Sequence, residues 1–516
     1  MQLERLTFVY QFLSQGGVEV LLRSRARELV RRGVDVQLLF LEAFGGEGLF
    51  EDMGDRVLVT GDKTEFLEAL DRFEPDWVLS LDTPSVVPWV RSSYPESGLL
   101  YEVHSTYPAS LAPLLDPDVL AGANGLLVPS PSQRELVKSL HTRPMPVRTV
   151  PDCLDDRFFG ATEPIETGGP PIVAWIGRLD ALKNWEGFIE LVRLVRRRCE
   201  IEIWLIGGNK ATTSEKERLE RLVREYGLAR DFRWRPHVES SDMPKIYKSI
   251  AARGGCLVST SWAESFGLVV LEAMACRCPV VVPDVIGLCD LVEDRENGLV
   301  YPPIQVELGC ERVVELVSSP ALRASVSERA REFAGRFRRG PVVDRLVQVL
   351  ECWDQGDDRD SDDGLSPFFE ATRFQGGKGV LTRKRAFQAF TGQTIRAHRD
   401  HQHEVGERDG TIRGLQEELH QKVGERDKTI EHLQSRIADF ELDASEVPRL
   451  AAECDTLKGE IAALTGRLEQ AEEQRGEAFS QRDALKEQTA ALTARMTLAE
   501  EQRGEAFSQR DALKEQ

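Results

Sequence analysis

Short apolar runs alternate with helical stretches along the first part of the chain. The apolar runs are LTFVY at 6–10, VDVQLLFL at 34–41, WVLSL at 77–81, LLYEVH at 99–104, GLLVPS at 125–130 and VRTVP at 147–151. Between the first two runs, apolar residues recur at helical spacing up to Gly33, and glycine is a residue that commonly follows a helix. Strands that are apolar throughout and separated by helices predict a parallel sheet covered on both faces.

The same alternation returns over residues 171 to about 340. Further strands are predicted at PIVAWIG (171–177), IEIWLIGG (201–208), FRWRPHV (232–238), CLVSTS (256–261) and PVVVPD (279–284). A Pro- and Gly-rich segment at 163–171 separates the two series. The pattern predicts an α/β protein with two Rossmann-like domains, over 1–160 and 170–353, and a ligand in the cleft at the carboxyl ends of the strands.

The remaining residues have a different pattern. An acidic linker at 354–364 leads into a basic amphipathic stretch at 383–399, so that 354–400 is a connecting segment. Residues 401–516 are predicted to be helical. A sequence unit beginning at 471 returns unchanged at 499, a step of 28 residues or four heptads, which predicts a left-handed coiled coil. We expect this region to mediate homo-oligomerisation or to bind a helical partner.

Composition limits the possible partners. The net charge of −20 disfavours nucleic acid. No apolar run approaches 18 residues, so no transmembrane helix is expected. Nine cysteines without framework spacing indicate reduced thiols in a cytoplasmic protein. The basic stretch leaves peripheral membrane contact open, although packing on the enzyme is the simpler interpretation. The D-x-D triplets in the acidic linker and the histidines at 398, 401 and 403 are interpreted as solvated residues rather than metal ligands.

The most informative stretch is SWAESFGLVVLEAMA at 261–275. It separates Glu264 and Glu272 by eight positions, a little over two helical turns. If the helix begins soon after Gly267, Glu264 lies just ahead of its N-terminus and Glu272 lies inside it. A helix N-terminus suits a phosphate, and two carboxylates on either side suit hydroxyl groups. A sugar nucleotide has that layout, although an ordinary amphipathic helix with two exposed glutamates is the alternative.

These residues resemble a known family. ESFGLVVLEAMA is similar to the E-x7-E signature of retaining GT-B glycosyltransferases, in particular glycosyltransferase family 4, and the resemblance covers roughly residues 5–350. Gly177, Arg178 and Lys183 are similar to its GR-x4-K motif. Two cations after a strand and beside a helix N-terminus form a natural clamp for a leaving diphosphate. Surface cations on a loop are the alternative.

The resemblance implies roles for further residues. Gly16 and Gly17 match a GGxE element that contacts donor phosphates or the acceptor, with a plain tight turn as the alternative. His104 matches a histidine that faces the transferred sugar. His237 lies in the segment that lines the nucleobase pocket, and Ser265, Phe266 and Gly267 complete the donor contacts. The chain departs from the family pattern at Arg277, Leu288 and Asp290, which puts the fine assignment of the donor in doubt.

The sequence therefore predicts a GT-B enzyme with a C-terminal coiled coil. It would transfer a sugar, with retention, from a nucleotide-sugar to a glycan or lipid-linked acceptor in polysaccharide biosynthesis. Glu264, His104, Arg178 and Lys183 are the expected catalytic residues, and no metal or other cofactor is expected. The alternative is a coiled-coil scaffold or spacer protein with an inactive GT-B module. Site residues that point away from one another would contradict the enzymatic interpretation.

Overall fold

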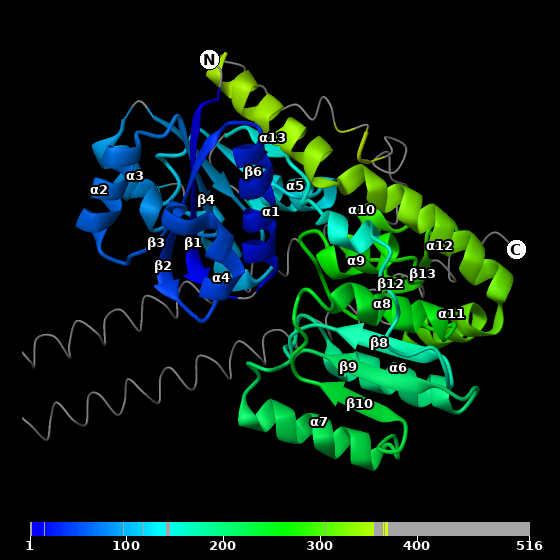
Figure 1. The fold of residues 1–516 in the computed structure, drawn as a ribbon. Coiled ribbons are helices and arrows are strands. Elements are labelled where there is room, and N and C mark those ends of the chain that lie inside the picture. Colours follow the sequence, from blue (N-terminus) through cyan, green and yellow to red (C-terminus); the bar gives the residue numbers. More distant parts are fainter. Residues whose placement is uncertain are drawn as a thin grey trace, which may run out of the picture. The chain divides into compact units, whose positions relative to one another are not determined.

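A computed structural model describes residues 3–369 of the 516-residue chain, apart from 15, 96, 117, 141–144, 304, 356–364 and 366. The acidic linker beyond residue 355 is therefore almost entirely outside the described residues. The basic stretch at 383–399, the histidines at 398–403 and the expected coil at 401–516 lie outside them completely. The described residues build two parallel sheets, each flanked by helices (Figure 1).

The first sheet belongs to the N-terminal half of the described chain. Its strand order is β3-β2-β1-β4-β5-β6-β7, and every pairing is parallel. The strands are β1 (Arg5–Leu13), β2 (Asp35–Ala43), β3 (Val57–Val59), β4 (Trp77–Leu81), β5 (Gly98–Glu102), β6 (Gly125–Val128) and β7 (Val147–Thr149). The helices between them are α1 (Gly17–Arg31), η1 (Glu47–Arg56), α2 (Lys63–Phe73), α3 (Val86–Ser93), α4 (Pro108–Leu111), η2 (Ala112–Leu115), α5 (Pro131–Leu140) and η3 (Asp156–Phe159).

The second sheet belongs to the C-terminal half. Its order is β10-β9-β8-β11-β12-β13, again with parallel pairings. The strands are β8 (Ile172–Ile176), β9 (Glu202–Ile206), β10 (Phe232–Arg235), β11 (Cys256–Val258), β12 (Val280–Pro283) and β13 (Leu299–Tyr301). The helices are α6 (Trp185–Arg196), α7 (Thr213–Glu225), α8 (Met243–Ala252), α9 (Leu268–Ala275), α10 (Leu288–Leu291), α11 (Val306–Ser318), α12 (Pro320–Ala334), η4 (Gly335–Phe337) and α13 (Arg339–Asp354).

The central strands are buried on both faces, as the continuous apolar runs indicate. Every residue of β4, β6 and β9 is buried. A strand in this position needs helices on both sides of its sheet, and parallel connections supply them. The prediction of two Rossmann-like α/β halves is confirmed.

The last described helix leaves the half in which its sequence neighbours lie. α13 follows η4 directly but contacts α1 of the N-terminal half (Figure 1). Leu346 and Val349 of α13 share an apolar cluster with Leu21 and Leu29 of α1. The same cluster includes Met274 of α9, so one apolar core extends across both halves.

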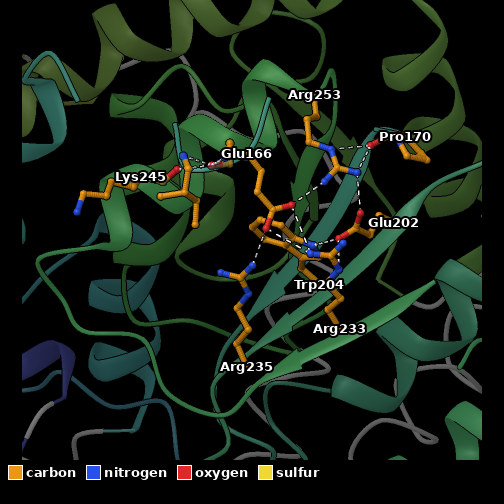
Figure 2. A network of polar contacts seen from close by, with 10 residues as sticks. Glu166, Pro170, Glu202, Trp204, Arg233, Arg235, Lys245 and Arg253 are labelled. Carbon is orange, nitrogen blue, oxygen red and sulfur yellow. Dashed lines mark hydrogen bonds and ion pairs between the residues drawn. The ribbon is translucent and has the colours of Figure 1, made fainter. Parts of the chain in front are cut away.

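An ionic network holds the segment that connects the halves (Figure 2). Glu166 of this segment accepts hydrogen bonds from Arg235 Nη2 and Arg253 Nη1, both at 3.0 Å. The Arg253 side chain is 1% exposed, and its Nη2 also donates to the Pro170 carbonyl oxygen and to Glu202 Oε2, each at 2.7 Å. The connecting segment is therefore fixed to β9 and β10 of the C-terminal half.

Candidate functional site

The site begins with the loop between β8 and α6, which carries Arg178 and Lys183. Asn184 caps α6 from a left-handed conformation, with φ of 51°, and its side chain accepts from Gly187 N–H. Asp180 Oδ1 accepts from the backbone N–H of Lys183 at 2.9 Å. These local bonds shape the loop and place the lysine side chain beside the N-terminus of the helix.

Lys183 meets Glu264, the first glutamate of the predicted pair. The lysine Nζ lies 2.6 Å from Oε1 and 2.7 Å from Oε2 of Glu264, and Ser261 Oγ donates to Oε1 at 2.7 Å. The two charged side chains are 22% and 15% exposed, so the pair is largely enclosed. The two residues are separated by 81 positions in the sequence, and the structure brings them into direct contact.

The first residues of two helices lie close together, and one of these helices, α9, begins shortly after Glu264. Gly16 and Gly267 are the N-caps of α1 and α9, and neither residue has a side chain to occupy the first N–H groups of its helix. A Cβ atom on Gly17 would lie 3.8 Å from Cδ1 of Leu268, the first residue of α9. Because both N-termini carry partial positive charge, their approach favours an anion at this point.

Ser265 and Phe266 precede α9 and contribute differently from each other. The Ser265 carbonyl oxygen accepts from Ser130 Oγ of the N-terminal half at 2.8 Å. The Phe266 side chain is 1% exposed and packs edge-to-face on Phe337, with ring centroids 5.5 Å apart. Phe266 therefore anchors the loop through the core and leaves only its backbone for a ligand.

Glu272 is the one polar residue of α9 and contacts α8. Its Oε2 accepts from the Tyr247 hydroxyl at 2.8 Å. Burial raises the pKa of Glu272 to about 7, while the Tyr247 hydrogen bond acts in the opposite direction. The structure therefore places Glu272 within the helix as predicted, with a carboxyl group that titrates near neutral pH.

Arg178 contacts the N-terminal half through Tyr107, a residue that the sequence interpretation did not select. Arg178 Nη2 donates to the Tyr107 hydroxyl at 2.7 Å, and that hydroxyl donates to Asp180 Oδ2 at 2.5 Å. The guanidinium carbon also lies 4.9 Å from the centroid of the Tyr107 ring. An aromatic residue three positions after His104 was the only signal for it in the sequence.

His104 lies at the end of β5, as predicted, but its side chain is enclosed. Its Nε2 is 2.9 Å from Glu102 Oε1, its Nδ1 is 3.4 Å from Asp152 Oδ1, and the side chain is 2% exposed. Burial lowers the pKa of His104, but the two carboxylates outweigh burial and raise it overall. Arg25 Nη1 completes the cluster at 2.7 Å from Glu102 Oε1.

His237 follows β10 and is exposed. Its Nε2 lies 2.9 Å from Glu239 Oε1. The neighbouring Trp234 donates from its indole nitrogen to the Gly207 carbonyl oxygen at 2.9 Å, which joins β10 to the end of β9. Trp234 therefore holds together two loops at the carboxyl edge of the second sheet.

A further pair of contacts joins the two halves. Ser132, at the start of α5, donates through its N–H to Asp290 Oδ2 at 3.0 Å, and its Oγ accepts from Gly287 N–H at 2.8 Å. Asp290 is one of the positions at which the chain departs from the family pattern. The two halves therefore approach each other at four pairs of residues: Gly17 and Leu268, Tyr107 and Arg178, Ser130 and Ser265, and Ser132 and Asp290.

Comparison with known families identifies the part of the chain that carries Arg178, Lys183 and Glu264. Residues 162–333 match the family model for glycosyl transferases group 1. This stretch is a glycosyltransferase group 1 domain. It spans the whole second sheet and ends in the last turn of α12.

Curated relatives agree with the domain match. A D-inositol 3-phosphate glycosyltransferase from Saccharomonospora viridis is 27% identical over 385 residues, which cover 65% of this chain and 88% of the relative. An alpha-D-kanosaminyltransferase from Streptomyces kanamyceticus is 32% identical over 180 residues, which cover 35% of this chain and 45% of the relative. The predicted enzyme class, a glycosyltransferase, is confirmed.

Solved structures agree on the fold. HepE from Anabaena, crystallised with UDP and glucose, superimposes with a TM-score of 0.59 at 17% identity, covering 67% of this chain and 99% of HepE. Sucrose-phosphate synthase from Thermosynechococcus elongatus gives a TM-score of 0.56 at 17% identity, covering 68% of this chain and all of that chain (100%). The described residues therefore have the GT-B fold. None of the described helices is both long and apolar enough to span a bilayer.

Proposed function

We propose that this chain is a retaining glycosyltransferase that moves a sugar from a nucleoside diphosphate to a glycan or lipid-linked acceptor. The observation that carries the proposal is the Lys183–Glu264 pair beside the N-termini of α1 and α9. A cation, a carboxylate and two positive helix ends at one point match the charges of a sugar diphosphate.

Each side chain has a role in this proposal. Lys183 and Arg178 hold the diphosphate and stabilise the negative charge that develops as it departs. Glu264, which Lys183 and Ser261 hold in place, binds hydroxyl groups of the transferred sugar. Glu272 binds the ribose hydroxyls from within α9. Gly16, Gly17 and Gly267 let backbone N–H groups approach the phosphates.

The remaining predicted residues act at the periphery of the donor. His237 lies where the nucleobase would bind, and Ser265 and Phe266 hold the loop that presents Glu264. His104 has both ring nitrogens opposite carboxylates, so we assign it to fixing the floor of the sugar site rather than to a free hydrogen bond with the sugar. No residue in this scheme requires a metal, since cations and helix ends already oppose the diphosphate charge.

The test is transfer by the purified full-length chain from a panel of nucleotide-sugars, beginning with UDP-glucose, which is bound in a solved HepE complex. Lys183→Ala should lower kcat by roughly 10²–10³-fold, the typical effect of removing one group that stabilises transition-state charge. Glu264→Gln should lower it comparably. Lys245→Ala is the matched control, because Lys245 is also paired with a carboxylate, at 2.7 Å, but lies on α8.

Turnover of both site variants at the wild-type rate would contradict the proposal. The anomeric coupling constant of the product, measured by NMR, tests retention separately. Inversion at the anomeric carbon would overturn that part of the proposal alone.

A further inference from the structure

Two strands of the first sheet extend beyond their neighbours at the carboxyl edge. β1 pairs with β4 only as far as Tyr10, and β2 pairs with β3 only as far as Phe40. The pairing between β1 and β2 continues to Leu13 opposite Ala43. The end of this pair therefore projects as a two-stranded extension from the edge at which ligands bind in open parallel sheets.

Three aromatic side chains follow this extension. Phe12 and Phe44 are 39% and 54% exposed, and their rings meet edge-to-face at 5.2 Å. Tyr10 and Phe12 also meet edge-to-face, at 6.5 Å. We call these three residues the aromatic ledge. Large aromatic side chains grouped on a surface commonly mark a binding site, because exposing them to water is unfavourable.

The ledge lies beside the loop that leads to Gly16, the N-cap of α1, because Phe44 N–H donates to the carbonyl oxygen of Leu13, the last residue of β1, at 2.8 Å. Burial raises the pKa of Tyr10, the carboxylates of Glu19 and Asp82 raise it further, and Arg178 acts to lower it. Tyr10 is therefore within electrostatic reach of Arg178, which we assign to the donor diphosphate. A ligand ring stacked on Phe12 and Phe44 would lie along the projecting ends of β1 and β2. It would be on the side of Tyr10 that faces away from β4.

The charges around the ledge select the kind of ligand. Glu47 and Glu51 are exposed on η1, which follows Phe44 directly, and Glu42 is exposed beside it. An anionic polymer or an anionic lipid surface would be repelled by these carboxylates. A neutral ring of saturated carbons with hydroxyl groups fits better, because its C–H face packs on aromatic rings and its hydroxyls bond to nearby carboxylates.

We propose that Tyr10, Phe12 and Phe44 form the acceptor subsite and bind an uncharged sugar or cyclitol ring. This inference rests on the proposed transfer reaction, because it supplies the ring that receives the sugar. The roles that we propose for Tyr10, Phe12 and Phe44 do not depend on those of Lys183 and Glu264, which act on the donor.

Saturation-transfer difference NMR on the full chain tests the subsite without requiring turnover. The probes are methyl α-D-glucopyranoside, glucose 6-phosphate and phosphatidylglycerol vesicles. We expect saturation of the ring protons of the neutral glycoside, weaker saturation of the phosphorylated sugar and no vesicle binding that depends on Phe12 and Phe44. The double variant Phe12→Ala/Phe44→Ala should lose the glycoside signal. Leu308→Ala, which removes another exposed apolar side chain, 37% exposed on α11, should retain it.

Three outcomes overturn the inference. They are no saturation of the neutral glycoside by the wild-type chain at millimolar concentration, an unchanged signal in the double variant, and tighter binding of the vesicles or the phosphorylated sugar that the double variant abolishes. In transfer assays the double variant should raise the acceptor KM about tenfold and leave the donor KM unchanged. A chain that binds the glycoside at the ledge but transfers no sugar would contradict the proposed function and leave the subsite standing.

Discussion

The carboxyl group of Glu272 shows how one residue's surroundings control its charge. It is the only polar group of an otherwise apolar helix, and burial is the main reason that its pKa is raised to about 7. Tyr247 is its hydrogen-bond donor, Arg157 acts to lower its pKa and Asp155 to raise it. A ribose diol bound as we propose needs the ionised carboxylate as acceptor.

Donor binding should therefore depend on pH through Glu272. As pH falls from 8 to 6, protonation of Glu272 should weaken nucleotide binding by up to about tenfold per pH unit below its pKa. Titration calorimetry with UDP at several pH values measures this. Glu272→Gln should bind weakly at all pH values and show a flat profile. A wild-type profile that is equally flat would contradict the role of Glu272.

The Arg25–Glu102 pair is a second residue-scale feature with measurable consequences. Both side chains are fully buried, and two N–H···O bonds of 2.7 and 2.9 Å join them. Burial acts to raise the pKa of Glu102, but Arg25 and His104 lower it to about 2. Arg25→Met should cost about 3–5 kcal/mol of unfolding free energy, because it leaves a buried carboxylate without its partner.

The sign of the pH effect follows from the lowered pKa. Glu102 contributes stability above its unfolded pKa, and this contribution is lost as pH falls toward 2. Urea unfolding at pH 7 and pH 3 should therefore show a smaller difference between wild type and Arg25→Met at the lower pH. Arg5→Met is a suitable control, since the Arg5–Glu74 pair at 3.1 Å is exposed. If Arg25→Met and Arg5→Met lose the same unfolding free energy at pH 7, breaking the buried pair costs no more than breaking the exposed one, which would contradict this prediction.

At the scale of elements, two loops hold Glu264 between them. Trp262 N–H donates to the Leu182 carbonyl oxygen at 2.9 Å, and Glu264 N–H donates to the Ile286 carbonyl oxygen at 3.0 Å. Gly287 follows with a φ of 80°, and a Cβ atom there would lie 2.3 Å from the carbonyl oxygen of Glu264. The loop before α10 thus fixes the backbone of Glu264.

Gly287→Ala should disturb the site more than the fold. The new methyl group clashes with the Glu264 backbone and also needs an unfavourable left-handed conformation, which displaces the glutamate. We expect a loss of transfer of at least about 10²-fold, since small displacements near the chemistry have large effects. Gly227→Ala, at a φ of 67° but with no atom within 4 Å of its Cβ, is the matched control. Equal transfer rates for Gly287→Ala and Gly227→Ala would contradict the prediction that displacing the Glu264 backbone impairs transfer.

The sequence predicted which residues belong to the candidate site better than it predicted the contacts that surround them. Arg178, Lys183 and Glu264 were selected because their motifs resemble those of family 4 and because each lies after a strand and before a helix, where positions converge in a parallel fold. Tyr107, Ser132 and Arg25 were missed because their contacts join residues 73, 158 and 77 positions apart, and no local periodicity reports such contacts. The position of His104 after a strand was predicted correctly, but its enclosure by Glu102 and Asp152 depends on two separate strand ends, those of β5 and β7.

At the scale of the whole molecule, the contacts of Tyr107 connect the two halves at the proposed donor site. Its hydroxyl bonds to both Arg178 and Asp180, and Asp180 in turn holds the backbone of Lys183. The orientation of the loop that we propose to bind the diphosphate therefore depends on a residue from the other half.

Tyr107→Phe should weaken donor binding about tenfold or more, because a hydrogen bond to a charged group contributes about 1.5–3 kcal/mol. The ring remains beside Arg178 in this variant, so Tyr107→Ala should weaken binding further. Tyr94→Phe is the matched control, since the Tyr94 hydroxyl also bonds to an aspartate, Asp71, but within the N-terminal half. Calorimetry with UDP measures all three. An unchanged Kd for Tyr107→Ala would exclude a positioning role.

The return of α13 to the first sheet brings Leu3 close to the last turn of that helix. Leu3, just before β1, and Trp77, the first residue of β4, border a small hollow. Leu350 and Asp354 near the end of α13 border the same hollow. Residues 3 and 354, which lie before and after the two sheets in the sequence, are therefore close together in space. A circular permutant of residues 3–355 that joins residue 355 to residue 3 by a short peptide, and opens at the exposed turn around Asn209, should therefore keep the Lys183–Glu264 contact.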